Sequence, residues 1–218
     1  MGLDLIVESC AKPGHEAEWR RFLELSFEGD EASDADVARF HEISIPPYER
    51  LGAPRVGTDA AADAWIIEAQ KATTPEEVAA ALKDFDGYHV VALVQSDGVP
   101  KYSHGGLYDG VDETSLRGSV LSLCSDVLDK GLIERAWDHK FPEAAVDYGR
   151  SLLAAADAAA TAGPPPRAPP KRGLFARLGL ARPGPEPLPF NEQVDAVQAA
   201  GRWFIFWGEK GHAIRAWF

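Results

Sequence analysis

The chain has 218 residues, enough for one sizeable core, and 45% of them are hydrophobic, which excludes a wholly disordered protein. Its net charge of −12 argues against binding to nucleic acid or anionic membranes and favours solubility or a basic protein partner. There is no apolar run of the about 18 residues that a membrane span needs, no secretory signal and no disulfide framework, since Cys occurs only twice. A soluble cytoplasmic protein is therefore expected.

In chain order, alternating apolar residues predict a strand over residues 3–9, and apolar positions at helical spacing predict a helix near 15–27. Ser33, with Asp36 three residues later, is expected to cap a second helix that continues to Ile43.

The middle of the chain predicts two more helices and a strand. Thr58 is expected to cap one helix, and the TPEE sequence at 74–77 is a capping box that begins another. The strongest strand pattern is YHVVALVQ at 88–95. A turn signal follows, and residues 99–103 are expected to return as a second strand.

Asp112 is expected to cap a long helix. The apolar face predicted for it consists of Leu116, Val120, Leu123, Cys124, Val127 and Leu128. Two further helices are predicted, over 132–140 and from Pro142 to about Ala160.

The C-terminal part begins with a Pro- and Arg-rich segment, 163–190, which holds nine of the 16 prolines. Asn191 is expected to cap a helix that ends at Gly201, and the residues after it to form a hairpin. In a strand, the aromatic sequence WFIFW at 203–207 is apolar on both faces, so this terminus must pack against the rest of the chain or against another chain.

These elements predict an α+β fold: a helix-rich single domain around a small mixed or antiparallel sheet of four to five strands, with a C-terminal β-hairpin. Residues 1–162 form the expected body, 163–190 a linker or insertion, and 191–218 a helix and hairpin that pack back on the body. Helices are expected to supply more than about 40% of the residues.

The most site-like loop runs from Tyr102 through Ser103 and His104 to Gly106. Its His-Gly-Gly sequence is similar to oxyanion-hole loops of lipase-like hydrolases, but no Gly-x-Ser-x-Gly sequence supplies a nucleophile. Because the loop leads to an expected helix start, its backbone amides and Arg117 could together bind a small anion.

No motif for a nucleotide, a metal ion or another cofactor is present, and none is predicted. The set Asp84, Asp86 and His89 has the right donor types but no recognised ligand spacing. Within 163–190, a short basic amphipathic stretch is a candidate interaction segment. Its candidate residues are Arg172, Leu174, Phe175, Arg177 and Leu178.

Three functional hypotheses follow. The first is a non-enzymatic module that binds another, basic, protein, for example an acidic immunity or inhibitor protein. The second is a small-ligand enzyme or hydrolase that uses the 102–106 loop, and the third is an adaptor that recruits a partner or a membrane through 163–190. A homodimer through the C-terminal hairpin is a further expectation, and membrane contact is disfavoured by the acidic charge.

Overall fold

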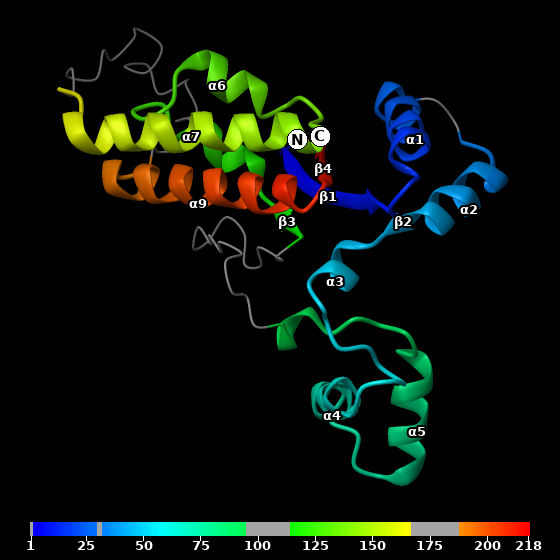
Figure 1. The fold of residues 1–218 in the computed structure, drawn as a ribbon. Coiled ribbons are helices and arrows are strands. Elements are labelled where there is room, and N and C mark those ends of the chain that lie inside the picture. The colour runs from blue at the N-terminus through cyan, green and yellow to red at the C-terminus, as the bar shows by residue number, and fades with distance from the viewer. Residues whose placement is uncertain (1, 30–31, 95–113, 167–187) are drawn as a thin grey trace, which may run out of the picture. The chain divides into compact units, whose positions relative to one another are not determined.

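The computed structural model describes residues 2–29, 32–94, 114–166 and 188–218 (Figure 1). They form two compact units. The N-terminal unit contains the described residues of Val7–Val99, and the C-terminal unit contains those of Met1–Ile6 and Pro100–Phe218. The fold is α+β as predicted, and 59% of the described residues are helical.

A four-stranded antiparallel sheet is centred on β1 (Asp4–Ala11). In the C-terminal unit, Leu5 and Ile6 of β1 pair with β3 (Ser115–Leu116). In the N-terminal unit, Cys10 and Ala11 pair with β2 (Ser44–Ile45). The remaining strand, β4 (His212–Trp217), also pairs with β1.

Two helices of the N-terminal unit confirm the predictions made from local signals. α1 (Glu16–Glu28) buries Trp19 and Leu23. α2 (Asp34–Ile43) begins with a complete capping box, because Ser33 accepts from the Asp36 N–H and the Asp36 carboxylate accepts from the Ser33 N–H. A short helix, α3 (Pro47–Arg50), follows α2 after β2.

Helices α4 (Ala60–Ala69) and α5 (Pro75–Asp84) enclose a small core. Its buried residues are Val56, Ala62, Ile66, Ala81 and Val90. The predicted cap at Thr58 is wrong, because its hydroxyl donates to the Arg55 carbonyl and Asp59 is the N-cap residue. Residues 88–94 contain a 3-10 turn, η1 (Val91–Leu93), in place of the predicted strand; only His89 pairs, in an isolated bridge with Arg55.

The capping box of α5 gives a direct test of these assignments. Thr74→Ala removes the hydroxyl that accepts the Glu77 N–H at 3.2 Å and is expected to cost about 1 kcal/mol of unfolding free energy. Thr58→Ala, which removes no helix cap, is expected to cost less than about 0.5 kcal/mol. Denaturant unfolding followed by circular dichroism measures both, and equal losses would contradict the assignment of the two caps.

In the C-terminal unit, the long helix predicted from Asp112 is wrong where the chain is described. Ser115 and Leu116 lie in β3, and a 3-10 helix, η2 (Gly118–Leu123), follows. Pairing with β1 overrides the helical pattern here, although Leu116, Val120, Cys124 and Leu128 are buried as that pattern predicted. The next helix is α6 (Lys130–Arg135), whose cap Asp129 accepts from the Leu132 N–H.

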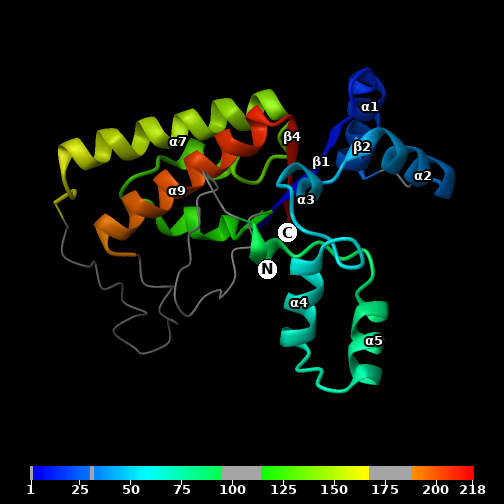
Figure 2. The same ribbon diagram turned by 60° about the horizontal axis from the view of Figure 1, so that its bottom comes forward.

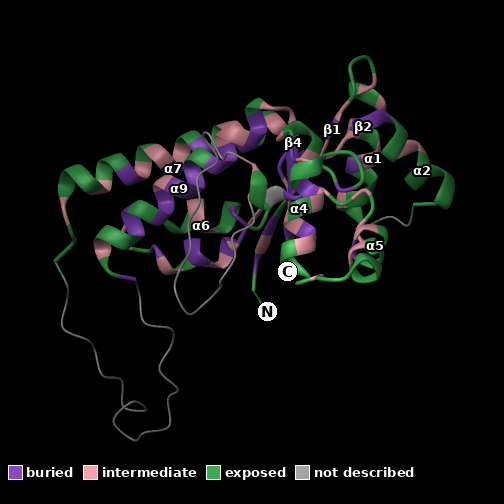
Figure 3. Ribbon diagram, turned by 90° about the horizontal axis from the view of Figure 1, so that it is seen from below, coloured by how far each residue is buried: buried purple, intermediate pink, exposed green. Residues whose placement is uncertain are grey.

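Two long helices, α7 (Pro142–Ala162) and α9 (Phe190–Glu209), lie side by side (Figure 2). α9 corrects the predicted C-terminus: it begins at Phe190, not after an Asn191 cap, and it continues through Gly201. Residues 202–207 are therefore helical, and the predicted hairpin is reduced to the single strand β4. Trp203, Phe204 and Trp207 are buried and Phe206 is half-buried, which confirms that this segment is largely shielded from water, whereas Trp217 and Phe218 are exposed. Figure 3 shows buried positions along α9 in purple.

Candidate protein-binding surface

Most of the ligand and interaction residues predicted from sequence lie outside the described residues. This applies to Tyr102, Ser103 and His104, and to the candidate interaction residues in the 163–190 segment. Arg117 is described and is the N-cap residue of η2. Its Nε lies 2.6 Å from the Asp4 Oδ1, so the cation expected to attract an anion is already paired with a carboxylate.

The metal hypothesis for Asp84, Asp86 and His89 gains no support. No group of three or more His, Cys, Asp and Glu side chains within the described ranges is placed to hold a metal ion. His89 Nδ1 lies 3.2 Å from the Ala53 carbonyl oxygen, and its ring stacks on Tyr48 at 6.2 Å between centroids.

Lys140 carries a buried amine. Its side chain Nζ donates to the carbonyl of Arg135 and, at 2.8 Å, to that of Asp138, and it lies 4.5 Å from the centre of the Tyr148 ring. Burial lowers its pKa to about 8, which Asp138 opposes and Arg135 reinforces. Because the residue is only 4% exposed and its Nζ donates to two carbonyls at the end of α6 and just after it, Lys140 is not placed to attack a substrate.

Charge is divided unequally between the two units. The segment Val7–Val99 holds 19 acidic and 8 basic residues, so it carries −11 of the total charge of −12. The rest of the chain is nearly neutral, with 15 acidic and 14 basic residues. The sequence analysis identified a basic stretch within 163–190 but missed this division, because no composition signal marks the boundary near residue 99.

Some carboxylates of the N-terminal unit serve its own structure. Glu18 accepts two hydrogen bonds from the guanidinium of Arg39, at 3.0 and 2.8 Å, and this contact lowers the pKa of Glu18. Glu77 accepts from the N–H groups of Thr73 and Thr74, which lowers its pKa in the same way. Asp59 and Asp63 also accept backbone N–H groups.

Other carboxylates of this unit are exposed and make no hydrogen bond or ion pair with the rest of the described chain. They are spread over α1, α2, α3, α4, α5 and the turn after α5, and we call this set of exposed residues the acidic surface: Glu24, Glu28, Asp34, Glu49, Glu68, Glu76, Asp84 and Asp86. Since no cation of the described residues pairs with them, they give the unit a field that attracts positively charged macromolecules.

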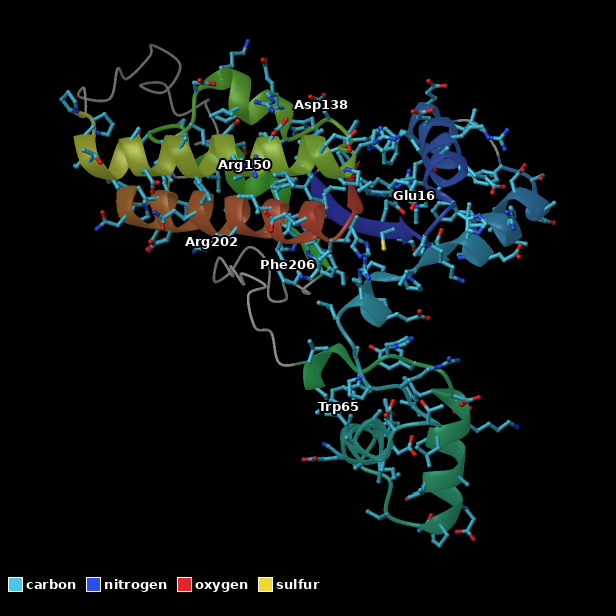
Figure 4. The ribbon with its side chains drawn as sticks, in the orientation of Figure 1. Glu16, Trp65, Asp138, Arg150, Arg202 and Phe206 are labelled. Atoms are coloured by element: carbon cyan, nitrogen blue, oxygen red, sulfur yellow. The ribbon has the colours of Figure 1, made fainter. Side chains whose placement is uncertain are left out.

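Aromatic side chains accompany these carboxylates. Tyr88, beside Asp86 in the chain, is 51% exposed and packs edge-on against Phe85 at 5.9 Å. Its backbone is fixed, because the Tyr88 N–H donates to Phe85 and its carbonyl accepts from Val56, both at 2.9 Å. Trp65, labelled on α4 in Figure 4, is partly buried against the small core. An exposed aromatic ring whose backbone is fixed, with a carboxylate two residues away in the chain, suits recognition of Lys and Arg side chains.

Comparison with known proteins adds no assignment: no family model, no curated protein and no solved structure matches this chain. None of the described helices combines the length and apolar character that crossing a membrane requires.

Proposed function

We propose that this protein is a non-enzymatic binding module whose N-terminal unit docks on a basic protein through the acidic surface. The observation that carries the proposal is the concentration of −11 of the net charge in Val7–Val99, combined with carboxylates that have no partner within the described chain. Complementary charge raises the association rate and selects partners of the opposite sign. An inhibitor or immunity protein that neutralises a basic partner is one form of this function.

The same proposal places the protein in the cytoplasm, where a reducing environment suits its two free and buried cysteines, Cys10 and Cys124. Residues 202–207, half of the hairpin through which a homodimer was expected, lie in α9, and Trp203, Phe204 and Trp207 are buried. The homodimer stays a prediction. No observation on the described residues favours the hydrolase or the adaptor hypothesis.

Two variants with the same net charge test the proposal. The first neutralises four members of the acidic surface: Glu24→Gln, Glu28→Gln, Glu68→Gln and Asp84→Asn. The second neutralises four exposed carboxylates of the C-terminal unit: Asp147→Asn, Glu192→Gln, Asp195→Asn and Glu209→Gln. None of these eight side chains makes a hydrogen bond or ion pair with the described residues, so both variants are expected to fold normally.

The partner is first captured with the intact protein from a lysate of the source cells and then purified for titration calorimetry at several salt concentrations. The first variant is expected to bind about tenfold more weakly, with a shallower dependence on salt, and the second to bind like the intact protein. Equal weakening in both variants, or an affinity that salt does not change, would reject the acidic surface as the docking site.

A further inference from the structure

The end of β4 is held by the short segment between α6 and α7 through three successive contacts. The backbone of Lys140 exchanges two hydrogen bonds with Ile214, each of 2.8 Å. Two residues further along β4, the Ala216 N–H donates to the His139 Nδ1 at 3.2 Å. Beyond it, the ring of Phe218 packs against Trp137 with centroids 5.3 Å apart.

The middle contact depends on protonation, whereas its neighbours do not. An imidazole nitrogen can accept an N–H only while it carries a free lone pair, so His139 must be neutral, with its proton on Nε2. Protonation would place an N–H on Nδ1, facing the Ala216 N–H, and would replace an attractive contact by a repulsive one. Histidine ordinarily changes its charge near pH 6.5, within the physiological range.

We propose that His139 is a pH-sensitive latch: the neutral imidazole holds the end of β4, and the imidazolium releases it. The residues beyond the latch are aromatic and exposed, with Trp217 at 62% and Phe218 at 60%. Release at acid pH therefore changes how an aromatic surface of the C-terminal unit is presented. This device is separate from the acidic surface and does not depend on the proposed function.

The charged groups around the latch come from each neighbouring element. Asp138, labelled in Figure 4, and Lys140 flank His139 in the chain, and Arg215 precedes Ala216 in β4. Arg135 ends α6, and Glu143 stands in the first turn of α7. The carboxylates favour the imidazolium and the cations oppose it, so together they set the pH at which the latch opens. A second histidine, His212, begins β4 and packs against Trp207.

Amide hydrogen exchange measured by NMR on the whole chain, between pH 7.5 and 5.0, tests the latch. Protection factors remove the intrinsic pH dependence of exchange. The Ala216 amide is expected to lose protection about tenfold or more, since the neutral fraction of an ordinary histidine falls to about 3% at pH 5.0. The Ile214 amide, which donates to the Lys140 carbonyl, is the internal control and is expected to stay protected.

His139→Asn is the matched variant, because its side-chain Oδ1 can accept the Ala216 N–H but does not titrate. Its Ala216 amide is expected to stay protected at pH 5.0, whereas His139→Ala is expected to lose that protection at both pH values. Unchanged protection of Ala216 in the natural protein would overturn the latch. An equal acid-induced loss in His139→Asn would also overturn it, by assigning the effect to His212 or to general unfolding.

Discussion

Replacing Gly149 by alanine is expected to destabilise the C-terminal unit by about 3 kcal/mol or more. A β-carbon at Gly149 of α7 would lie 2.6 Å from the carbonyl oxygen of Gly201 in α9, and 2.8 Å from the Cγ1 of Ile205. The reverse approach is equally close, because a β-carbon at Gly201 would lie 2.9 Å from the Gly149 carbonyl oxygen. Backbone atoms cannot turn aside as a side chain can, so the two helices would have to separate.

Intrinsic helix preference works in the opposite direction. Glycine inside a helix is about 1 kcal/mol less favourable than alanine, yet α7 and α9 keep glycine at Gly149, Gly201 and Gly208. A β-carbon at Gly208 would also collide, 2.6 Å from the Pro142 carbonyl oxygen. Alanine at these positions would stabilise an isolated helix but is expected to destabilise the folded unit. Only the close approach of the two helices explains this destabilisation.

Denaturant unfolding, followed by the fluorescence of the buried tryptophans, measures this loss. Gly201→Ala is expected to cost a similar amount, and the double variant less than the sum, because both substitutions oppose the same approach. Ala154→Leu, at an exposed position of α7, is the control and is expected to change stability by less than about 0.5 kcal/mol. A Gly149→Ala protein as stable as the natural one would contradict the packing of α7 on α9.

The same glycines show where sequence reasoning succeeds and fails. Gly201 was expected to end a helix, since glycine commonly does so. Its actual role, contact with another helix, depends on a partner more than 50 residues away that no local pattern reveals. The prediction of a strand at 203–207 was wrong for a related reason. Burial of most of the segment was predicted correctly, although Ile205 and Phe206 are only half-buried, but an apolar run of this length fits a helix as well as a strand.

Signals contained within a few residues were more reliable. The N-cap at Ser33, the capping box at Thr74 and the start of α7 at Pro142 were predicted because the atoms concerned are close in sequence. The strand predicted at 88–95 was wrong where the chain is described, because strand preference alone does not form a strand without a partner strand. The described residues pair with His89 only in an isolated bridge. For the candidate site, net charge favoured a basic partner, but assigning that charge to one unit required the fold.

Lys140→Met is expected to abolish one contribution to stability, which rises between about pH 8 and pH 10.5. Burial of the ammonium group against Tyr148 and Phe204 lowers the pKa of Lys140 to about 8, compared with about 10.5 in the unfolded chain. Between these values the unfolded chain holds a proton that the folded protein has lost. Raising the pH through this window therefore favours the folded protein, by up to about 3 kcal/mol in total and about 1.4 kcal/mol per pH unit.

Two other buried groups act in the opposite sense and must be separated from Lys140. Burial raises the pKa of Cys124 to about 12 and raises that of Tyr148 as well. The folded protein keeps these protons above about pH 9 and pH 10, where the unfolded chain loses them, so each lowers stability as the pH rises. Both groups remain in Lys140→Met, and the difference between the two unfolding free energies isolates the amine.

Urea unfolding at intervals from pH 7 to pH 10 measures that difference. The advantage of the natural protein over Lys140→Met is expected to grow steadily above about pH 8, as the buried amine becomes neutral while still donating to the Asp138 carbonyl. Lys130→Met, at an exposed position of α6, is expected to give a difference that does not change with pH. If the curves for the natural protein and Lys140→Met ran parallel, the amine would have to reach water, and the packing of α6, α7 and α9 around it would be wrong.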